Sequence, residues 1–300
     1  MKIGFVGLGK MGMQMTTRLI KGGHQVVAMD VAPAAVAQAE ALGATAVASR
    51  EELLKALGTG QPAVVWLMIP SHIVETEVDA WLELLPAGSI IVDGGNSDFR
   101  DTIKRGERAL ARNVAIVDVG TSGGILGLEN GFSMMVGGTK EAVEAVRPAI
   151  MSLAQQDGWD HFGPVGSGHY IKMVHNGIEY GLMESYAEGF RLLHDGPVAG
   201  IDLGKVAGVW QNGSIIASGL NSLAASVLVA NPNLDGIDGY VAENSEAAWT
   251  LETAAAAGVD LPAIQTAVDV RHASQGGTVH FGTKLLAALR NAFGGHAVNK

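Results

Sequence analysis

A glycine-rich loop lies between an apolar strand pattern and a helical pattern at the start of the chain. Residues 2–6 form a short apolar run that predicts a buried strand, and the spacing of apolar residues over 11–21 predicts a helix. With 41 glycines in the chain the Gly-x-Gly-x-x-Gly spacing alone is weak, but the flanking strand and helix give it context. In such a loop the backbone N–H groups and the helix dipole face a pyrophosphate. We therefore predict a dinucleotide site at Gly7, Leu8, Gly9, Lys10, Met11 and Gly12.

The second apolar run, residues 25–29, ends in Asp30. An acidic residue about 20 residues beyond the glycine loop can accept hydrogen bonds from the adenosine ribose hydroxyls. Its carboxylate repels a 2′-phosphate, and residues 31–34 contain no lysine or arginine that would neutralise one. We therefore predict NAD and not NADP as the cofactor. The alternative is that Asp30 only caps the loop that follows it.

Short β-branched runs alternate with helical patterns through the first half of the chain. Strands are predicted at residues 2–6, 25–29, 63–69, 89–92, 115–119 and 132–136, and the helical patterns between them include 11–21, 33–42 and 50–57. Apolar residues at nearly every strand position indicate a parallel sheet covered on both faces. From about Gly166 onward the spacing is helical. The predicted fold is a doubly wound, Rossmann-like α/β domain over residues 1–166, followed by an all-helical domain over residues 167–300.

Composition restricts the partners. The formal net charge is -10, which opposes nonspecific binding to nucleic acid or to anionic membranes. The chain has no cysteine, and residues 1–6 run directly into a strand pattern without the features of a signal peptide, so we expect a cytoplasmic protein. Amides and serines interrupt the uncharged stretch 206–234, which favours burial in a helical domain or an oligomer interface over a membrane span. The Ala-rich, weakly charged helical half suggests a homo-oligomer.

Lys172, Asn176 and Glu179 follow the predicted sheet within one helical pattern. Their spacing places an amine, an amide and a carboxylate on one helix face, over about two turns or roughly 10 Å. Such a face suits acid–base chemistry on a small polyol, because the amine can accept a hydroxyl proton while hydride leaves carbon and the carboxyl can return a proton elsewhere. Taken alone, the pattern fits an ordinary surface helix equally well.

Two polar segments follow predicted strands at the edge of the sheet where ligands bind. Asp93-Gly94-Gly95-Asn96-Ser97 comes after the strand at 89–92, and Gly120-Thr121-Ser122-Gly123-Gly124 comes after the strand at 115–119. Carboxyl ends of parallel strands lie at one edge of the sheet, so both segments are expected near the glycine loop.

In order along the chain, Gly-Leu-Gly-x-Met-Gly, Asp-Gly-Gly-Asn-Ser, Ser-Gly-Gly and Lys-Met-Val-His-Asn-Gly-Ile-Glu-Tyr resemble the motifs of decarboxylating 6-phosphogluconate dehydrogenases. The last string is highly specific. The resemblance implies the pentose phosphate pathway reaction, in which 6-phospho-D-gluconate and NAD give D-ribulose 5-phosphate, CO2 and NADH. It implies that Lys172 is the base for oxidation at C3 and that Glu179 is the acid that protonates C1. The substrate contacts that it implies are Asn96, Ser122, Gly123, Gly124, His175 and Asn176. Asn96 is also assigned to the cofactor.

The same resemblance implies a phosphate site made by Tyr180, Arg271 and Arg290. Arg290 and His296 are similar to a tail that enters a neighbouring subunit's active site, which implies a homodimer or homotetramer with both residues contributed in trans. Two arginines would supply the local cationic pocket that an anionic substrate needs in a chain of net charge -10. Without the resemblance, both would be ordinary helix-surface residues.

The chain also departs from the family pattern. It is much shorter than the long enzymes, which carry a duplicated helical region, and so resembles a short form found in some bacteria. The phosphate-binding lysine of the family has no counterpart in residues 227–233.

Two other functions were weighed. A related β-hydroxyacid dehydrogenase, of the 3-hydroxyisobutyrate or tartronate semialdehyde type, would share the glycine loop, Ser-Gly-Gly and a catalytic lysine. A noncatalytic NAD-binding sensor would keep the fold without turnover, although retention of Lys172 and Glu179 argues against it. No metal site is predicted, since no two of the nine histidines are four residues apart.

Overall fold

The computed structural model describes residues 1–242 and 245–298, and it divides into two compact units, Met1–Met173 and Val174–Lys300. The sequence placed the domain boundary a few residues earlier, between residues 166 and 167. The long helix α8 (Ser167–Asp195) begins in the first unit and continues into the second.

The first unit is a doubly wound α/β domain, as predicted. Its strands are β1 (Lys2–Val6), β2 (Gln25–Met29), β3 (Thr45–Ala46), β4 (Val64–Leu67), β5 (Ile90–Asp93), β6 (Ala115–Ser122), β7 (Phe132–Gly137) and β8 (Ala154–Gly163). Its helices before α8 are α1 (Lys10–Lys21), α2 (Pro33–Ala41), α3 (Arg50–Gly58), α4 (Ser71–Leu84), α5 (Phe99–Ala111), α6 (Gly127–Asn130) and α7 (Lys140–Leu153). Among the described residues these strands form one sheet of order β3-β2-β1-β4-β5-β6-β7-β8.

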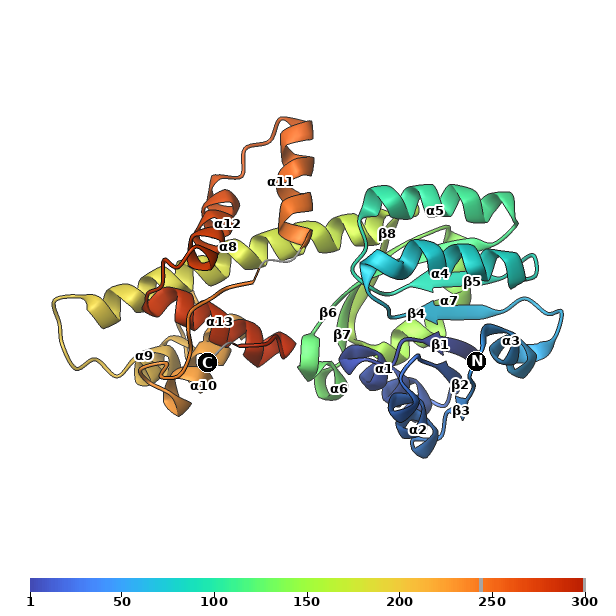
Figure 1. Cartoon of the computed structure of the whole chain (residues 1–300), viewed down its shortest axis with the longest axis horizontal. Coiled ribbons are helices and arrows are strands. Elements are labelled where there is room, and N and C mark those ends of the chain that lie inside the picture. Colours follow the sequence, from blue (N-terminus) through green and yellow to red (C-terminus); the bar gives the residue numbers. More distant parts are fainter. Residues whose placement is uncertain (243–244, 299–300) are drawn as a thin grey trace. The chain divides into compact units, whose positions relative to one another are not determined.

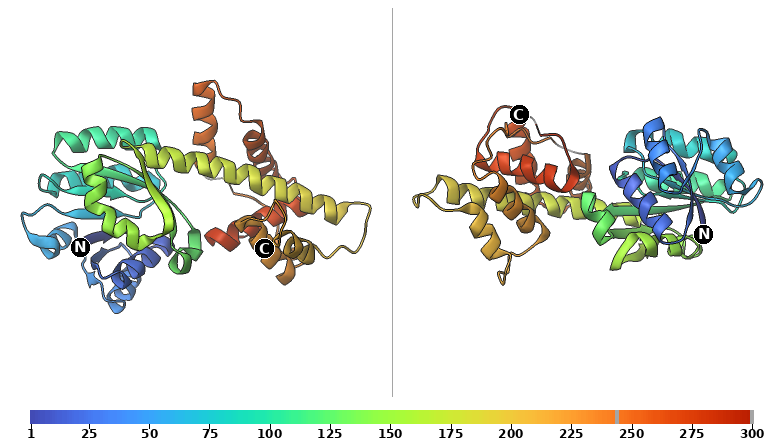
Figure 2. Two further views of the ribbon diagram at one scale, coloured as in Figure 1. Left: turned by 180° about the vertical axis from the view of Figure 1, so that it is seen from behind. Right: turned by 90° about the horizontal axis from the view of Figure 1, so that it is seen from below.

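Helices cover both faces of this sheet (Figures 1 and 2). On one face, Met15 and Leu19 of α1 and Val146 of α7 pack into a core with strand residues such as Phe5. On the other, α3, α4 and α5 enclose a second core around Trp81. Burial of strand side chains on both faces explains why the strands were recognisable as continuous apolar runs.

The sequence did not predict the strands β3 and β8, nor the direction in which β7 pairs with β6. β3 has two residues, and β8 is a polar edge strand in which only Ala154 is buried, so neither has an apolar run. β7 pairs antiparallel with β6, whereas an entirely parallel sheet was expected. The chain reaches β7 from β6 through the short α6, which leaves no long crossover of the kind that a parallel pair requires.

The second unit is helical, as predicted. After α8 come α9 (Leu203–Trp210), α10 (Gly219–Ala230), α11 (Ser245–Ala257), α12 (Pro262–Gln275) and α13 (Phe281–Gly294). Phe190 of α8, Leu228 of α10 and Leu285 of α13 share its main core. The uncharged stretch 206–234 proves to be parts of two helices, α9 and α10, separated by residues 211–218. In the described parts of the chain, no helix combines the length and apolarity needed to cross a membrane.

Candidate active site

The glycine loop joins β1 to α1, and its three glycines differ in what surrounds them. Gly7 has φ of 94°, and a Cβ there would overlap the carbonyl oxygen of Met68. A Cβ on Gly12 would overlap the carbonyl of Gly7, so this glycine lets the helix pack on the turn. At Gly9, by contrast, a Cβ would meet no described atom within 4 Å, which leaves room above the backbone for a phosphate group. The loop therefore fits a dinucleotide pyrophosphate.

A cleft of about 680 Å³ lies along this loop within the first unit. Gly7, Gly9, Lys10, Met11 and Gly12 line it, together with Asp30, Asn96, Thr121 of the segment expected near this loop, and residues that were not predicted as site residues, among them Arg50 and Glu77. Its size is typical of cofactor sites. Leu8 differs from the other loop residues, because its side chain is in the core and is 4% exposed.

Asp30, at the end of β2, fixes the loop from the side. Its Oδ2 accepts a hydrogen bond from the backbone N–H of Leu8 at 2.5 Å, and its Oδ1 accepts one from the N–H of Ala32 at 2.7 Å. Asp30 thus caps the following loop, as in the alternative weighed above, and also lines the cleft. The two roles coexist because a carboxylate has about four acceptor positions.

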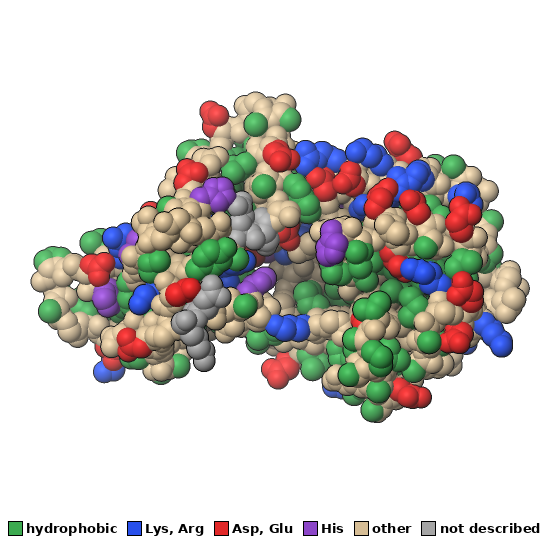
Figure 3. Space-filling view, viewed as in Figure 1, with side chains coloured by type: hydrophobic (Ala, Val, Ile, Leu, Met, Phe, Trp, Pro, Cys, Tyr) green, Lys and Arg blue, Asp and Glu red, His purple; other side chains and the backbone are tan. Residues whose placement is uncertain are grey.

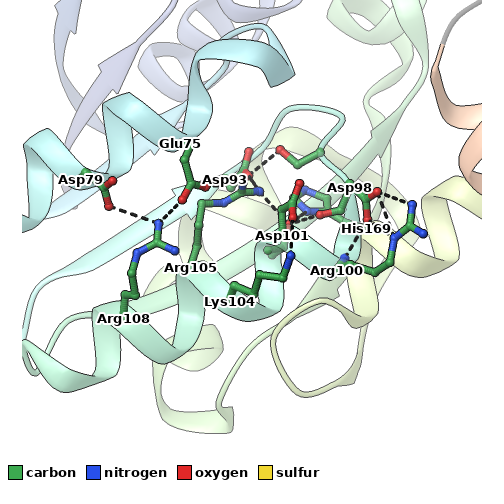
Figure 4. Close-up of polar contacts among 12 residues, drawn as sticks. Glu75, Asp79, Asp93, Asp98, Arg100, Asp101, Lys104, Arg105, Arg108 and His169 are labelled. Atoms are coloured by element: carbon green, nitrogen blue, oxygen red, sulfur yellow. Dashed lines mark hydrogen bonds and ion pairs between the residues drawn. The ribbon is translucent and has the colours of Figure 1, made fainter.

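A buried network holds the Asp93–Ser97 segment beneath the cleft (Figure 4). Asp93 Oδ2 accepts hydrogen bonds from the Ser97 hydroxyl at 2.7 Å and from Arg105 of α5 at 3.4 Å. Arg105 also donates to the Thr102 hydroxyl at 2.9 Å, and that hydroxyl lies 2.8 Å from Nδ1 of His169. The network therefore ties the loop that carries Asn96 to the first turn of α8.

Around this network the surface of α4 and α5 carries paired charges. Arg108 contacts Glu75 and Asp79, and Arg112 contacts Glu83 at 2.6 Å. Figure 3 shows basic and acidic side chains interspersed over these helices. This differs from the uniformly basic surfaces that bind nucleic acid.

Asp118 of β6 anchors the start of α8. Its carboxylate accepts hydrogen bonds from the backbone N–H groups of Gly166 at 2.7 Å and His169 at 2.9 Å. A Cβ on Gly120 would overlap the Cβ of Lys172, so the helix lies directly against the strand. Lys172 is consequently held beside β6, and its side chain is 7% exposed.

The segment after β6 is shorter than expected. β6 continues to Ser122, whereas the predicted strand ended at residue 119, so only Gly123 and Gly124 of the motif lie beyond it. The φ of Gly123 is 133°, a conformation that L-residues rarely adopt.

Farther along α8, the polar residues of the specific string interact with one another. Nδ1 of His175 lies 3.1 Å from Oδ1 of Asn176 and 3.9 Å from a carboxylate oxygen of Glu179. Asn176 is 7% exposed. Lys172, Asn176 and Glu179 keep the helical spacing that the sequence predicted, since α8 is continuous through them.

A buried arginine dominates the polar cluster of the second unit. Arg271 of α12 is 1% exposed, and its guanidinium carbon lies 3.2 Å from the ring centroid of Tyr180. Among the described residues its Nε and Nη1 have no hydrogen-bond partner. Burial, with repulsion from Arg290, lowers the pKa of Arg271 to about 10 against the attraction of Tyr180 and Glu179, which leaves the guanidinium charged at neutral pH. A buried cation with unused donors is costly unless an anion binds there.

Arg290 of α13 belongs to the same cluster. It is 7% exposed, and burial lowers its pKa while Tyr180 and Glu179 oppose that shift. Arg290 is therefore close enough to Tyr180 and Glu179 of its own chain for their charges to act on it, and its contribution to a neighbouring subunit stays a prediction. His296 lies beyond the end of α13 and is exposed.

Glu184 was not predicted, although it lies one turn beyond Tyr180 on α8. It is 5% exposed, and among the described residues its Oε2 has no hydrogen-bond partner. Burial, followed by repulsion from Glu188, raises the pKa of Glu184 to about 7, and Arg271 partly offsets the shift. Its spacing from Tyr180 was visible in the sequence, but its burial depends on the packing of α12.

Replacing Glu184 with glutamine is expected to change how stability depends on pH. The Glu184 carboxyl has a higher pKa in the folded state than in the unfolded state, so between these two pKa values the unfolded chain loses the proton first. The free energy of unfolding of wild type should therefore fall as pH rises from about 4.5 to about 7. Glu184→Gln should match wild type near pH 4.5 and exceed it by about 3 kcal/mol above pH 7. Urea unfolding across this range measures the difference, with the exposed Glu144→Gln as control. Parallel pH profiles for wild type and Glu184→Gln would contradict the assignment.

The first unit is a dinucleotide-binding domain of the dehydrogenase type, followed by a helical unit that carries a buried cationic cluster. Residues 2–166 match the model of the NAD binding domain of 6-phosphogluconate dehydrogenase, and residues 168–280 match that of the 6-phosphogluconate dehydrogenase C-terminal domain. The chain belongs to the 6-phosphogluconate dehydrogenase family.

Relatives support this along the full length. A Bacillus subtilis (strain 168) protein described as "Putative 6-phosphogluconate dehydrogenase YqeC" is 39% identical over 300 residues, which is 100% of both chains. The NAD(+)-dependent, decarboxylating 6-phosphogluconate dehydrogenase of Haloferax volcanii is 39% identical over 301 residues, covering 99% of this chain and 98% of its own. The solved structure of Plasmodium falciparum 6-phosphogluconate dehydrogenase, described with NADP+ and with 6-phosphogluconate, superposes with a TM-score of 0.81 at 26% identity, covering 96% of this chain and 70% of that one.

Proposed function

We propose that this protein oxidatively decarboxylates 6-phospho-D-gluconate to D-ribulose 5-phosphate and CO2, with NAD as the oxidant. The observation that carries the choice of a phosphorylated substrate is Arg271, a fully buried cation with two nitrogens that lack partners among the described residues. A phosphate dianion would satisfy these donors. Tyr180 and Arg290 complete the proposed phosphate site.

The proposed chemistry assigns the proton transfers to two α8 side chains, those at the C3 oxygen to Lys172 and the one to carbon to Glu179. The neutral amine of Lys172 accepts the C3 hydroxyl proton as the C3–H bond breaks. NAD, held by the glycine loop, would supply the acceptor for that hydrogen and its electron pair. The resulting β-keto acid loses CO2 by cleavage of the C1–C2 bond, with Lys172 donating its proton to the C3 oxygen. Glu179 then protonates the carbon next to the lost carboxylate while the neutral Lys172 amine takes back the proton of the C3 hydroxyl, so the enediol becomes the ketone of the product.

The remaining polar residues are proposed to orient the substrate. His175 and Asn176 would bind hydroxyl oxygens, and Asn96, Ser122, Gly123 and Gly124 would surround the carboxylate end. The hydrogen bond network beneath Asn96 supports this role, because it fixes the backbone of that loop.

NAD is proposed on the position of Asp30, whose carboxylate lines the cleft beyond the glycine loop. We further propose that the enzyme is a cytoplasmic homodimer or homotetramer to which His296 contributes in trans. Contribution of Arg290 in trans remains a prediction, but its burial beside Tyr180 and Glu179 favours a role in its own chain.

A steady-state assay tests the proposal directly. NADH production is measured with 6-phosphogluconate or gluconate, and with NAD or NADP in turn. We expect turnover with 6-phosphogluconate and NAD, and release of one CO2 per NADH. Binding of NAD without turnover of either sugar acid would instead indicate a sensor, and NADH production without CO2 would indicate a β-hydroxyacid dehydrogenase.

A further inference from the structure

An ion pair lies at the Asp30 side of the cofactor cleft. Arg50 Nε donates to Glu77 Oε1 at 2.9 Å, and its Nη2 donates to Oε2 at 2.5 Å. The guanidinium and the carboxylate therefore form a bidentate ion pair. Both residues line the cleft together with Asp30. The side chain of Glu77 is 14% exposed and that of Arg50 is 36% exposed, so the pair is partly shielded from water.

The topology places Arg50 near the end of the cleft where a 2′-phosphate would lie. Asp30 follows β2, and Arg50 opens α3 after β3, which is the parallel neighbour of β2. The carboxyl ends of these two strands share one edge of the sheet. In dinucleotide-binding folds an acid at the end of β2 binds the ribose hydroxyls, whereas a nearby arginine accommodates the 2′-phosphate of NADP. This chain has both, and the arginine is the first residue of the helix predicted at 50–57, where no cofactor contact was expected.

Glu77 resolves the conflict between them. The Glu77 carboxylate already accepts from two donors of the Arg50 guanidinium, in the bidentate geometry that a phosphate would use. A 2′-phosphate would therefore have to compete with this carboxylate. The hydrogen bonds from Arg50 to Glu77 also raise the pKa of Arg50, as expected for a cation that is stabilised by its partner.

We propose that Glu77 is a specificity-determining residue, which withholds Arg50 from the 2′-phosphate and so reinforces the preference for NAD that Asp30 establishes. This inference rests on the proposed use of NAD. It assigns discrimination to Asp30 after β2, Arg50 at the start of α3 and Glu77 on α4, of which only Asp30 was predicted from the sequence.

Binding of cofactor fragments tests the proposal without any substrate. The dissociation constants of ADP and 2′,5′-ADP are measured by calorimetry on wild type, Glu77→Gln, Arg50→Gln and the double variant. Wild type should prefer ADP. Glu77→Gln should improve 2′,5′-ADP binding by about 5-fold, which is the upper end of the coupling of a partly exposed pair, and change ADP binding by less than about 2-fold. The double variant should lose the gain.

Glu83→Gln is the matched control. Glu83 lies on the same helix, α4, and pairs with Arg112 at 2.6 Å, but neither residue lines the cleft. It should leave both dissociation constants unchanged. Unchanged ADP affinity in Glu77→Gln also shows that the cleft remains folded.

The outcomes separate this inference from the function on which it rests. A wild type that prefers ADP, with a Glu77→Gln variant that has the same ratio of affinities, overturns the role of Glu77 alone. A gain that survives in the double variant overturns the role of Arg50. If wild type prefers 2′,5′-ADP, the assignment of NAD fails, and the inference fails with it. Failure to oxidise 6-phosphogluconate affects none of these measurements.

Discussion

The Lys172→Met variant is expected to lose NADH formation from 6-phosphogluconate, with kcat lower by about 10²- to 10⁴-fold. The amine is the proposed acceptor of the C3 hydroxyl proton, and methionine retains most of the side-chain volume without a basic atom. The packing of the Lys172 Cβ against Gly120 is unaffected by the change, because it involves only the atoms nearest the backbone. Steady-state kinetics with saturating NAD measures the loss.

NAD affinity separates a chemical role for Lys172 from a structural one. The residues that line the cofactor cleft all lie between Val6 and Thr121 in the sequence, and Lys172 is not among them. Lys172→Met should therefore bind NAD as wild type does. Lys104→Met is the control, since Lys104 is exposed on α5 and pairs with Asp101 at 3.1 Å. Full turnover in Lys172→Met would remove this residue as the base. A parallel loss of NAD binding would point to a disturbed fold.

The sequence predicted the parts of the fold whose signals are local. The glycine loop and the strands buried on both faces are recognisable from short segments, because the glycine spacing and the apolar content of β1 are properties of a few consecutive residues. β8 lies at the edge of the sheet, and its polar residues are compatible with a loop. Its pairing with β7 is a tertiary property that no local pattern contains.

The residues of the candidate site also fall into those that local spacing predicted and those that only tertiary packing brings together. Lys172, Asn176 and Glu179 could be placed on one helix face from their spacing alone. Arg50 and Glu77 could not be paired, because they are 27 residues apart and meet only when α3 and α4 pack at one edge of the sheet. Arg271 was assigned by resemblance, but its burial and its unpartnered nitrogens come from the packing of α12 against Tyr180 of α8.

The second large expected effect is the loss of kcat/KM when the buried Arg271 is replaced. In Arg271→Met, kcat/KM for 6-phosphogluconate should fall by roughly 30- to several thousand-fold, which corresponds to the loss of about 2–5 kcal/mol for a buried charge pair. The same parameter for gluconate should change little, since gluconate has no phosphate to contact the guanidinium. Kinetics with both substrates measures this loss of discrimination.

The free energy of unfolding should respond to Arg271→Met much less than activity does. Replacing a buried charge with an apolar side chain of similar length is often neutral or stabilising, and here it would also remove a cation that has unused donors. Loss of the contact with the Tyr180 ring opposes this gain, so we expect the unfolding free energy to change by less than about 2 kcal/mol. Arg191→Met is the control, because Arg191 is exposed on α8 and pairs with Asp195 at 3.4 Å. An equal loss of kcat/KM with both substrates, or a large loss of stability, would mean that Arg271 supports the helical unit and does not recognise phosphate.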